Sequence, residues 1–142
     1  VPLNARLSFN LTPAAGVKRY GLLLRTDAGG SESTDIVFTP ADRTVAFTRK
    51  TESCMKVSNS LSTLTKVMGL EKPMRVEVLF YHDLIDVEIN SERTLINRFW
   101  NPAGDNVRFW AEGGETTFSD ITLRPVTEQP LTFPPSPQRE EP

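Results

Sequence analysis

At 142 residues, the chain has the length of a single domain and can bury a sizeable apolar core without metal ions or disulfides. Its net charge is −2 and its isoelectric point is near 5.5, with lysines and arginines scattered along the chain, which argues against binding to nucleic acid. Cys54 is the only cysteine, so no intramolecular disulfide can form, and we expect this thiol to be packed or idle.

The first fifty residues carry the pattern of β-strands. Residues 5–11 alternate apolar and polar side chains, which is the period of a half-buried strand. Residues 17–25 form a second and more apolar run, and a Gly-rich break follows it. Residues 35–39 and 43–49 predict a hairpin across the turn residues 40–42.

Residues 50–72 are less regular than the strands before them. Four apolar residues recur there at helical spacing, namely Leu61, Leu64, Val67 and Met68. Gly69 can end a short turn, and serine and threonine are frequent. The segment is therefore either a short helix or an irregular crossover that lies over the core.

Strand patterns resume after Pro73. Residues 76–80 and 85–89 each alternate apolar and polar side chains around a turn at His82 and Asp83. A tight turn at that point places the two apolar sets on one face of the hairpin, as a buried face requires. Three more strands follow, and they cover residues 93–100, 106–111 and 116–124.

Many short strands without helical segments between them predict an all-β fold, a two-sheet antiparallel β-sandwich of the jelly-roll or concanavalin-like kind. The strands define one module over residues 1–126. Residues 127–142 contain five prolines and end in acidic residues, so we expect a proline-rich tail or linker. No apolar run approaches the ~20 residues that a membrane-spanning helix needs.

The residues from Arg75 to Val126 resemble the closing half of the C-terminal sandwich of glycoside hydrolase family 32, the fructan- and sucrose-cleaving enzymes, and residues 20–49 resemble its opening half. In that family a strand of the form D-x-S-x-x-E-x-F-x-N precedes a turn and a strand with a characteristic arginine. Asn90 and Arg98 match the family's Asn and Arg, and Asp86 stands where the family has Glu.

The same motif also shows departures from the family. Its Asp, Ser and Phe fall on Tyr81, Asp83 and Glu88 in this chain. These altered positions are polar and lie near one strand face. The resemblance therefore leaves open whether the chain binds the family's ligand, a different ligand or none. The resemblance covers about residues 5–126, which is nearly all of the chain.

The resemblance implies a non-catalytic module. Catalysis in that family belongs to a separate N-terminal propeller, and none of its acidic motifs occurs in this sequence. The implied function is binding of oligo- or polysaccharides with fructose units, such as levan or inulin, beside a tethered catalytic propeller. The alternative is a purely structural domain that packs against the propeller or mediates oligomerisation.

Four residues form the predicted sugar-binding site: Asp86, Glu88, Arg98 and Trp100. The two acids lie on the strand face opposite the apolar residues, and charged groups of this kind bind sugar hydroxyl pairs in bidentate fashion. Trp100, with Trp110 and Tyr81, offers flat apolar surface for sugar C–H groups. We expect Arg98 across from Asp86 if the turn at residues 90–92 takes three residues, and Asn97 there if it takes two.

No cofactor, metal ion or catalytic residue is predicted. His82 is the only histidine and lies in a predicted turn, which leaves a catalytic triad or a zinc site without its ligands. The loop at residues 27–35 is rich in oxygen ligands but lacks the spacing of a calcium-binding loop, so it is expected to be a plain turn.

Overall fold

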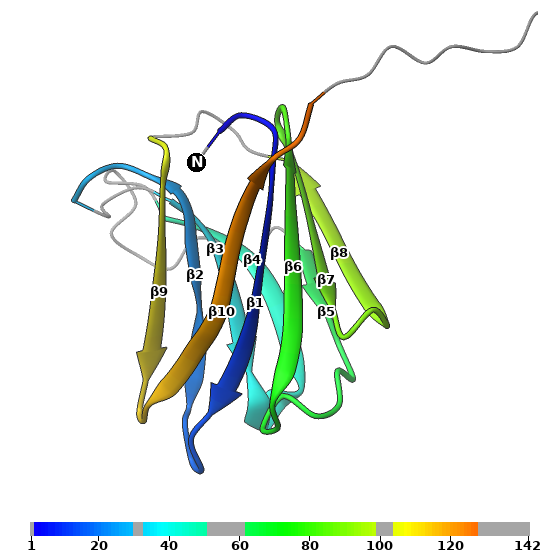
Figure 1. The fold of residues 1–142 in the computed structure, drawn as a ribbon. Helices are drawn as coiled ribbons and strands as arrows, with labels where there is room; N and C mark the ends of the chain where they lie inside the picture. The colour runs from blue at the N-terminus through cyan, green and yellow to red at the C-terminus, as the bar shows by residue number, and fades with distance from the viewer. Residues whose placement is uncertain (1, 30–32, 51–61, 99–103, 128–142) are drawn as a thin grey trace, which may run out of the picture.

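In the computed structural model, the described residues are 2–29, 33–50, 62–98 and 104–127. They form two antiparallel five-stranded sheets that pack face to face, so the predicted all-β sandwich is confirmed (Figure 1). Cys54, Trp100 and residues 128–142 of the predicted tail lie outside the described residues. No helix in the described part of the chain is long and apolar enough to cross a membrane.

Strands from both halves of the sequence contribute to each sheet. Sheet A contains, from edge to edge, β10 (Thr116–Pro125), β1 (Ala5–Pro13), β6 (Met74–Tyr81), β7 (Leu84–Ile89) and β8 (Arg93–Arg98). Sheet B contains β5 (Ser62–Leu64), β4 (Thr44–Lys50), β3 (Ser33–Thr39), β2 (Arg19–Thr26) and β9 (Asn106–Glu112). One turn of 3-10 helix, Pro40–Asp42, connects β3 to β4.

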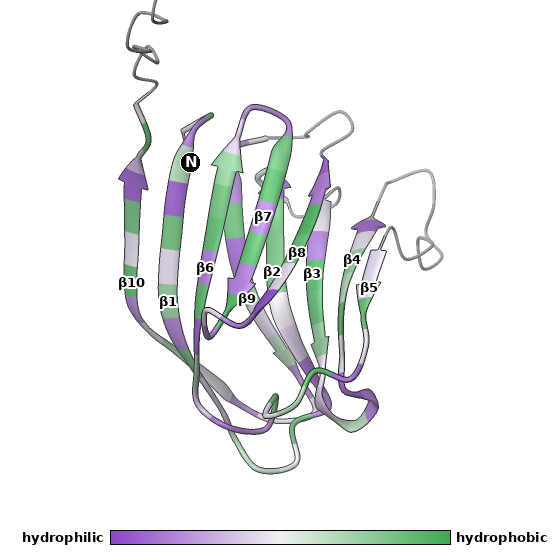
Figure 2. Cartoon of the chain, turned by 90° about the vertical axis from the view of Figure 1, so that its right-hand side faces the viewer, coloured by the Kyte–Doolittle hydropathy of each residue, from purple (hydrophilic) through white to green (hydrophobic). Residues whose placement is uncertain are grey.

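Alternating side chains build the core between the two sheets. Figure 2 shows hydrophobic and hydrophilic bands alternating along β1, β7 and β10. The apolar residues of β1, β6 and β7 point inward and meet those of β2, β3 and β4. Tyr20 is fully buried there, stacks on Phe38 at 5.0 Å between ring centroids, and donates its hydroxyl to the Leu70 carbonyl at 2.6 Å.

The hairpin of β6 and β7 has the register that its alternation predicts. Val78 pairs with Val87 and Phe80 pairs with Ile85 across the turn at His82 and Asp83. These four side chains are fully buried. Because successive side chains of a strand alternate between faces, the polar residues of both strands point to the outside of sheet A.

Over residues 62–72, the part of this segment that the structure describes, the chain is a crossover and contains no helix. Residues 62–64 pair with β4 as a short strand, and turns follow up to β6. Val67 and Leu70 are buried against the core, whereas Met68 is exposed. Gly69 has a φ of +79°, which suits the turn that ends there. Val67 and Leu70 therefore cover part of the core from within the connector.

The chain changes sheet between its last two strands. The turn at Gly113 and Gly114 connects β9 in sheet B to β10 in sheet A, which lies beside β1 (Figure 1). Phe9, Phe109 and Phe118 pack together at this edge, with ring centroids 4.6 to 5.9 Å apart. This aromatic cluster joins the two sheets where β9 and β10 meet.

Arg25 is a buried cation beside the N-terminal segment. Its guanidinium lies 4.9 Å from the Phe80 ring centroid and donates to the carbonyls of Pro2 and Leu3 at 2.7 and 3.0 Å. An exposed carboxylate, that of Asp105, lies 3.9 Å away. Arg25 thereby connects β2 and β6 to the segment that leads into β1.

Candidate functional site

The outer face of sheet A carries the predicted acids. Asp86 lies in a row of side chains that crosses four strands, because Arg6 pairs with Leu79, Leu79 with Asp86, and Asp86 with Ile96. Paired residues of neighbouring strands point to the same face of a sheet. Asp86 therefore lies between two apolar side chains, with Arg6 at the far end of the row.

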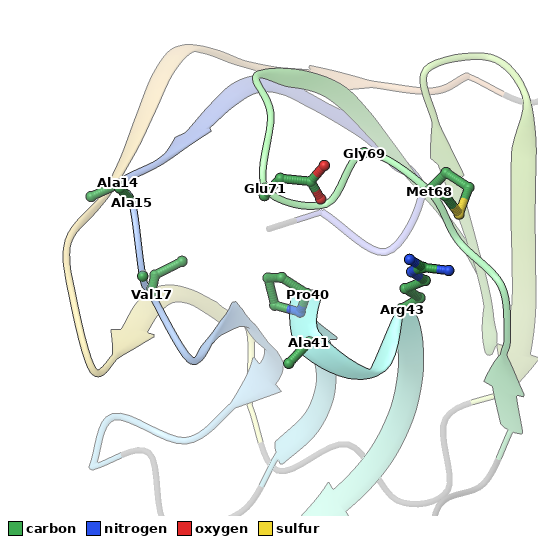
Figure 3. Close-up of a pocket in the computed structure, with 10 residues that line it drawn as sticks. Ala14, Ala15, Val17, Pro40, Ala41, Arg43, Met68, Gly69 and Glu71 are labelled. Carbon is green, nitrogen blue, oxygen red and sulfur yellow. The ribbon is translucent and has the colours of Figure 1, made fainter.

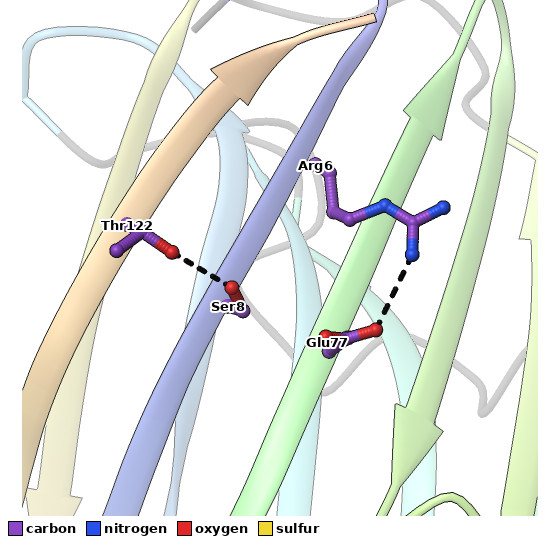
Figure 4. Close-up of polar contacts among 4 residues, drawn as sticks. All are labelled: Arg6, Ser8, Glu77 and Thr122. Carbon is purple, nitrogen blue, oxygen red and sulfur yellow. Dashed lines mark hydrogen bonds and ion pairs between the residues drawn. The ribbon is translucent and has the colours of Figure 1, made fainter.

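Glu88 lies in the neighbouring row. Ser8 of β1 pairs with Glu77 of β6, and Glu77 pairs with Glu88 of β7. Ser8 and Thr122 of β10 share a hydrogen bond of 2.8 Å between their hydroxyls, so the row continues to the sheet edge (Figure 4). The two glutamates stand side by side, and their like charges require nearby cations.

Arg6 supplies one of these cations. Figure 4 shows its side chain extending from β1 across the face toward Glu77 on β6. The guanidinium and the carboxylate are 3.4 Å apart, and both side chains are partly exposed to solvent. An exposed ion pair of this kind contributes little to stability, about 0–1 kcal/mol, so it can open to another partner at low cost.

Arg75 lies on the other side of the two glutamates. Its guanidinium donates to the Asn10 side chain at 3.0 Å, and Asn10 donates in turn to Asp120 at 2.8 Å. The backbone amide of Arg75 donates to the Asn90 side chain at 2.9 Å, and the Asn90 amide donates to the Arg75 carbonyl at 2.8 Å. Asn90 thus fastens the turn after β7 to β6, a positional role for the residue that matches the family motif.

We refer to Arg6, Arg75, Glu77, Asp86 and Glu88 together as the charged patch. Two shallow hollows lie along it. A hollow of about 280 Å³ lies against Arg75, and one of about 50 Å³ lies against Arg6 and Asp86. The two hollows share Glu77 and Glu88 in their walls, so the patch is one continuous polar depression with cations at two sides.

Asp86 has an unusual environment within the charged patch. Burial beside its apolar neighbours raises the pKa of the Asp86 carboxyl, the charge of Glu88 raises it further, and Arg6 lowers it. The Oδ1 atom of Asp86 is buried and has no hydrogen-bond partner within the described residues. An ionised carboxylate with an unused acceptor is costly, so this oxygen is poised to accept a donor.

Arg98 does not lie across from Asp86, so that prediction is wrong. The turn at residues 90–92 does take three residues, and Ile89 pairs with Arg93. Counting outward from that pair brings Ile96 opposite Asp86 and Arg98 opposite Leu84. Arg98 still lies on the same outer face, one diagonal step from Asp86.

Of the aromatic residues considered in the sequence, Tyr81 lies on this face and Trp110 does not. Tyr81 ends β6, is 38% exposed and lies across from Leu84 in the hairpin with β7. Trp110 lies on β9 in sheet B, where its ring covers Gly21. Trp110 is therefore on the opposite side of the sandwich from Asp86. The sequence alone does not determine to which of the two sheets each aromatic residue belongs.

Three residues of the charged patch, Arg6, Arg75 and Glu77, were not predicted as site residues. Arg6 and Glu77 occupy outward positions in the alternating segments 5–11 and 76–80, and that pattern was visible in the sequence. Their relation to Asp86 depends on β1 lying next to β6, two strands about seventy residues apart in the chain. No local signal reports this pairing.

The described residues contain no group of three or more His, Cys, Asp or Glu side chains that suits a metal ion. The charged patch itself has three carboxylates, but Arg6 and Arg75 stand among them. Its chemistry is that of hydrogen bonding with both signs of charge, which suits a neutral ligand with many hydroxyl groups.

Comparison with known families gives one match. The model of the glycosyl hydrolases family 32 C-terminal domain matches residues 2–125, which confirms the resemblance found in the sequence. None of the curated proteins compared with the chain matches it.

Solved structures with the same fold come from several kinds of protein. A carbohydrate binding module, CBM66 from Bacillus subtilis, has a TM-score of 0.67 and 8% identity, over 87% of this chain and 76% of that one. Congerin II with lactose and MES bound has a TM-score of 0.69 and 10% identity, over 87% of this chain and 95% of the other. At such identities the likeness shows the fold alone.

A larger enzyme contains the same fold as one part. The sucrose-6-phosphate hydrolase of Lactobacillus gasseri has a TM-score of 0.59 and 15% identity, and the match covers 88% of this chain and 25% of the hydrolase. The sandwich thus corresponds to about a quarter of that chain.

Proposed function

The chain belongs to the family of glycosyl hydrolase family 32 C-terminal domains, and from this premise we propose that it is a non-catalytic accessory module that binds sugars. The proposed ligands are oligo- and polysaccharides with fructose units, such as levan and inulin. The proposed partner is a catalytic domain in the same protein that cleaves fructans or sucrose. In support, the sandwich matches a quarter of the length of a sucrose-6-phosphate hydrolase.

The observation that carries this proposal is the charged patch with its unpaired Asp86 oxygen. A sugar hydroxyl donates one hydrogen bond and accepts others, so it can meet a carboxylate and a guanidinium at once. The patch offers both groups side by side at Arg6, Glu77 and Asp86. Leu79 and Ile96 beside Asp86 offer apolar surface for the C–H groups of the ring.

The arrangement of the acids supports a binding role over a hydrolytic one. Glycosidases place two carboxyl groups on opposite sides of the scissile bond. Asp86 and Glu88 are two positions apart on β7 and point to the same side, and Glu77 is the cross-strand partner of Glu88. We propose that Asp86, Glu88 and Arg98 bind sugar hydroxyls together with Arg6 and Glu77.

Replacing Asp86 with asparagine tests the site with two opposite expected effects. Affinity for inulin or levan oligosaccharides should fall roughly ten- to a hundredfold, because a hydrogen bond to a charged group contributes about 1.5–3 kcal/mol. Stability near pH 7 should rise, because the pKa of Asp86 is raised in the folded state. Titration calorimetry and thermal unfolding measure the two effects on the same protein samples.

The sign of the stability effect follows from proton linkage. Between the unfolded and folded pKa values of Asp86, the folded chain binds more protons than the unfolded chain, so stability falls as the pH rises through that window. The variant should lose its advantage below the ordinary aspartate pKa of about 3.9. Glu115→Gln, a change at an exposed turn, should alter neither property. Unchanged affinity in Asp86→Asn would place the site elsewhere, and a wild type that binds neither sugar would refute the proposal.

A second candidate function is docking to a partner domain. Ile121 and Leu123 on the edge strand β10 are 49% and 45% exposed, although Leu123 pairs with the buried Leu7. Large apolar side chains on an open sheet edge are typical of surfaces that another protein covers. This candidate is compatible with the first, because the charged patch is centred on β6 and β7, away from β10.

Replacing Leu123 with threonine should test the docking surface. We expect the wild-type chain to self-associate weakly at high concentration in light scattering, because Ile121 and Leu123 are about half exposed, and we expect the variant to remain monomeric. Stability should change little, since a half-exposed side chain on an edge strand loses only part of its burial. Identical scattering from both proteins at every concentration would count against docking through β10.

A further inference from the structure

We propose that one end of the sandwich holds a second sugar-binding site, a pocket between three loops that takes a single sugar unit. Its walls come from the loop between β1 and β2, the turn between β3 and β4, and the connector between β5 and β6. The choice of a sugar as ligand rests on the proposed function. The pocket itself shares no residue with the charged patch.

The pocket has the size of a small-molecule site. Its volume is about 450 Å³, inside the common range of about 300–1,000 Å³. Figure 3 shows side chains of all three loops around one opening, with Val17 and Pro40 on one side and Met68 and Arg43 on the other. The carboxylate of Glu71 borders the same opening.

Backbone hydrogen bonds hold these loops in place. The Arg43 amide donates to the Pro40 carbonyl at 3.1 Å, and the Val67 amide donates to the Arg43 carbonyl at 2.9 Å. The Lys72 amide donates to the Gly69 carbonyl at 3.0 Å and closes the turn that carries Glu71. The pocket is therefore formed before any ligand arrives, which lowers the entropic cost of binding.

The two charged side chains select for a neutral ligand with hydroxyl groups. Arg43 and Glu71 have opposite charges, both are exposed, and neither takes part in an ion pair within the described residues. A phosphate attracted by Arg43 would be repelled by Glu71. An ammonium group attracted by Glu71 would be repelled by Arg43. A pair of sugar hydroxyls accepts from the guanidinium and donates to the carboxylate.

Apolar side chains provide the remaining contact. Val17 is buried and Pro40 is half-buried, so they form a firm wall, whereas Met68 is exposed and unbranched and can adapt to the ligand. A sugar ring has apolar C–H faces and polar edges. The wall and the charged pair match these two kinds of surface.

Chemical-shift mapping of the whole chain tests the proposal. We would titrate ¹⁵N-labelled protein with inulin oligosaccharides and follow the backbone amides. Amides at 15–17, 41–43 and 68–71 should shift in addition to those of β6 and β7. In the double variant Arg43→Ala, Glu71→Gln, the apparent affinity fitted from the shifts at the pocket should fall roughly tenfold. The shifts on β6 and β7 should persist with the wild-type affinity. Both changes are at exposed positions, so a dispersed spectrum serves as the control for folding.

The outcomes separate the second site from the proposed function. Shifts confined to β6 and β7 would overturn the pocket and leave the proposed function standing. Shifts confined to the pocket would support the pocket and remove the charged patch as the binding site. Absence of shifts everywhere at millimolar sugar would overturn both. Free glycine, a zwitterion, is the control for ligand class, and stronger shifts with glycine than with sugar would overturn the choice of ligand.

Discussion

Replacing Gly21 with alanine should lower the melting temperature of the chain by roughly ten degrees, a loss of about 3 kcal/mol. Gly21 lies on β2, an interior strand of sheet B between β3 and the edge strand β9. A Cβ atom there would overlap the Ile36 carbonyl oxygen and lie 3.2 Å from the Trp110 ring. The clash is with backbone, so two strands must move apart to relieve it.

Gly29→Ala is the matched control for this change. No atom lies within 4 Å of the position that its Cβ would take. We expect this variant to melt within about two degrees of wild type, since exposed substitutions change stability by about 0.5 kcal/mol or less. Thermal unfolding followed by circular dichroism measures both variants. Equal melting temperatures for Gly21→Ala and wild type would mean that β2 and β3 do not approach as closely as described.

Replacing Arg25 with alanine should destabilise the chain by about 2–4 kcal/mol. The guanidinium is 5% exposed, lies over the Phe80 ring and donates to two backbone carbonyls of the N-terminal segment. The change removes these charged hydrogen bonds and opens a cavity over Phe80. The neighbouring carboxylate of Asp105 is exposed, so most of the loss comes from the carbonyls and the ring.

Arg19→Ala is the control from the same strand. Arg19 pairs with Glu112 on the surface, and both side chains are about half exposed. Such pairs contribute about 0–1 kcal/mol, so Arg19→Ala should change the midpoint of urea unfolding only slightly. Hydrogen exchange provides a local readout, because the backbone amides of residues 3–5 should lose protection in Arg25→Ala alone. Similar losses for the two arginine variants would show that Arg25 acts as an ordinary surface charge.

The strands were predictable because each carries its own alternation. Val76, Val78 and Phe80 alternate with polar residues, and a two-residue turn can join them to β7 only in the register that buries both apolar sets. β8 lacks such an alternation of buried apolar and outward polar residues. Leu95 alone is buried there, while Ile96 is 58% exposed on the outer face. The position of Arg98 follows instead from the turn at residues 90–92, because a three-residue turn pairs Ile89 with Arg93 and so places Arg98 opposite Leu84.

The charged patch was predictable only in part. The outward direction of Asp86 and Glu88 follows from the alternation in β7, a local property. The cations that flank these acids come from β1 and from the start of β6. Which strand lies beside β6 is decided by the packing of the whole core, and strands of similar composition compete for that place. The local pattern therefore identified Asp86 and Glu88 and missed Arg6, Arg75 and Glu77.

The position of β1 between β6 and β10 also governs how the chain reaches its native state. The hydroxyls of Ser8 and Thr122 meet although 114 residues separate them in sequence. Closing a loop of that length costs entropy before its contacts form, and folds rich in such contacts fold slowly. Within this module, β1 is synthesised long before β10, its neighbour in sheet A. Until β10 is present, the edge of β1 that pairs with it is open, and an open strand edge is a place where other chains can pair and aggregate.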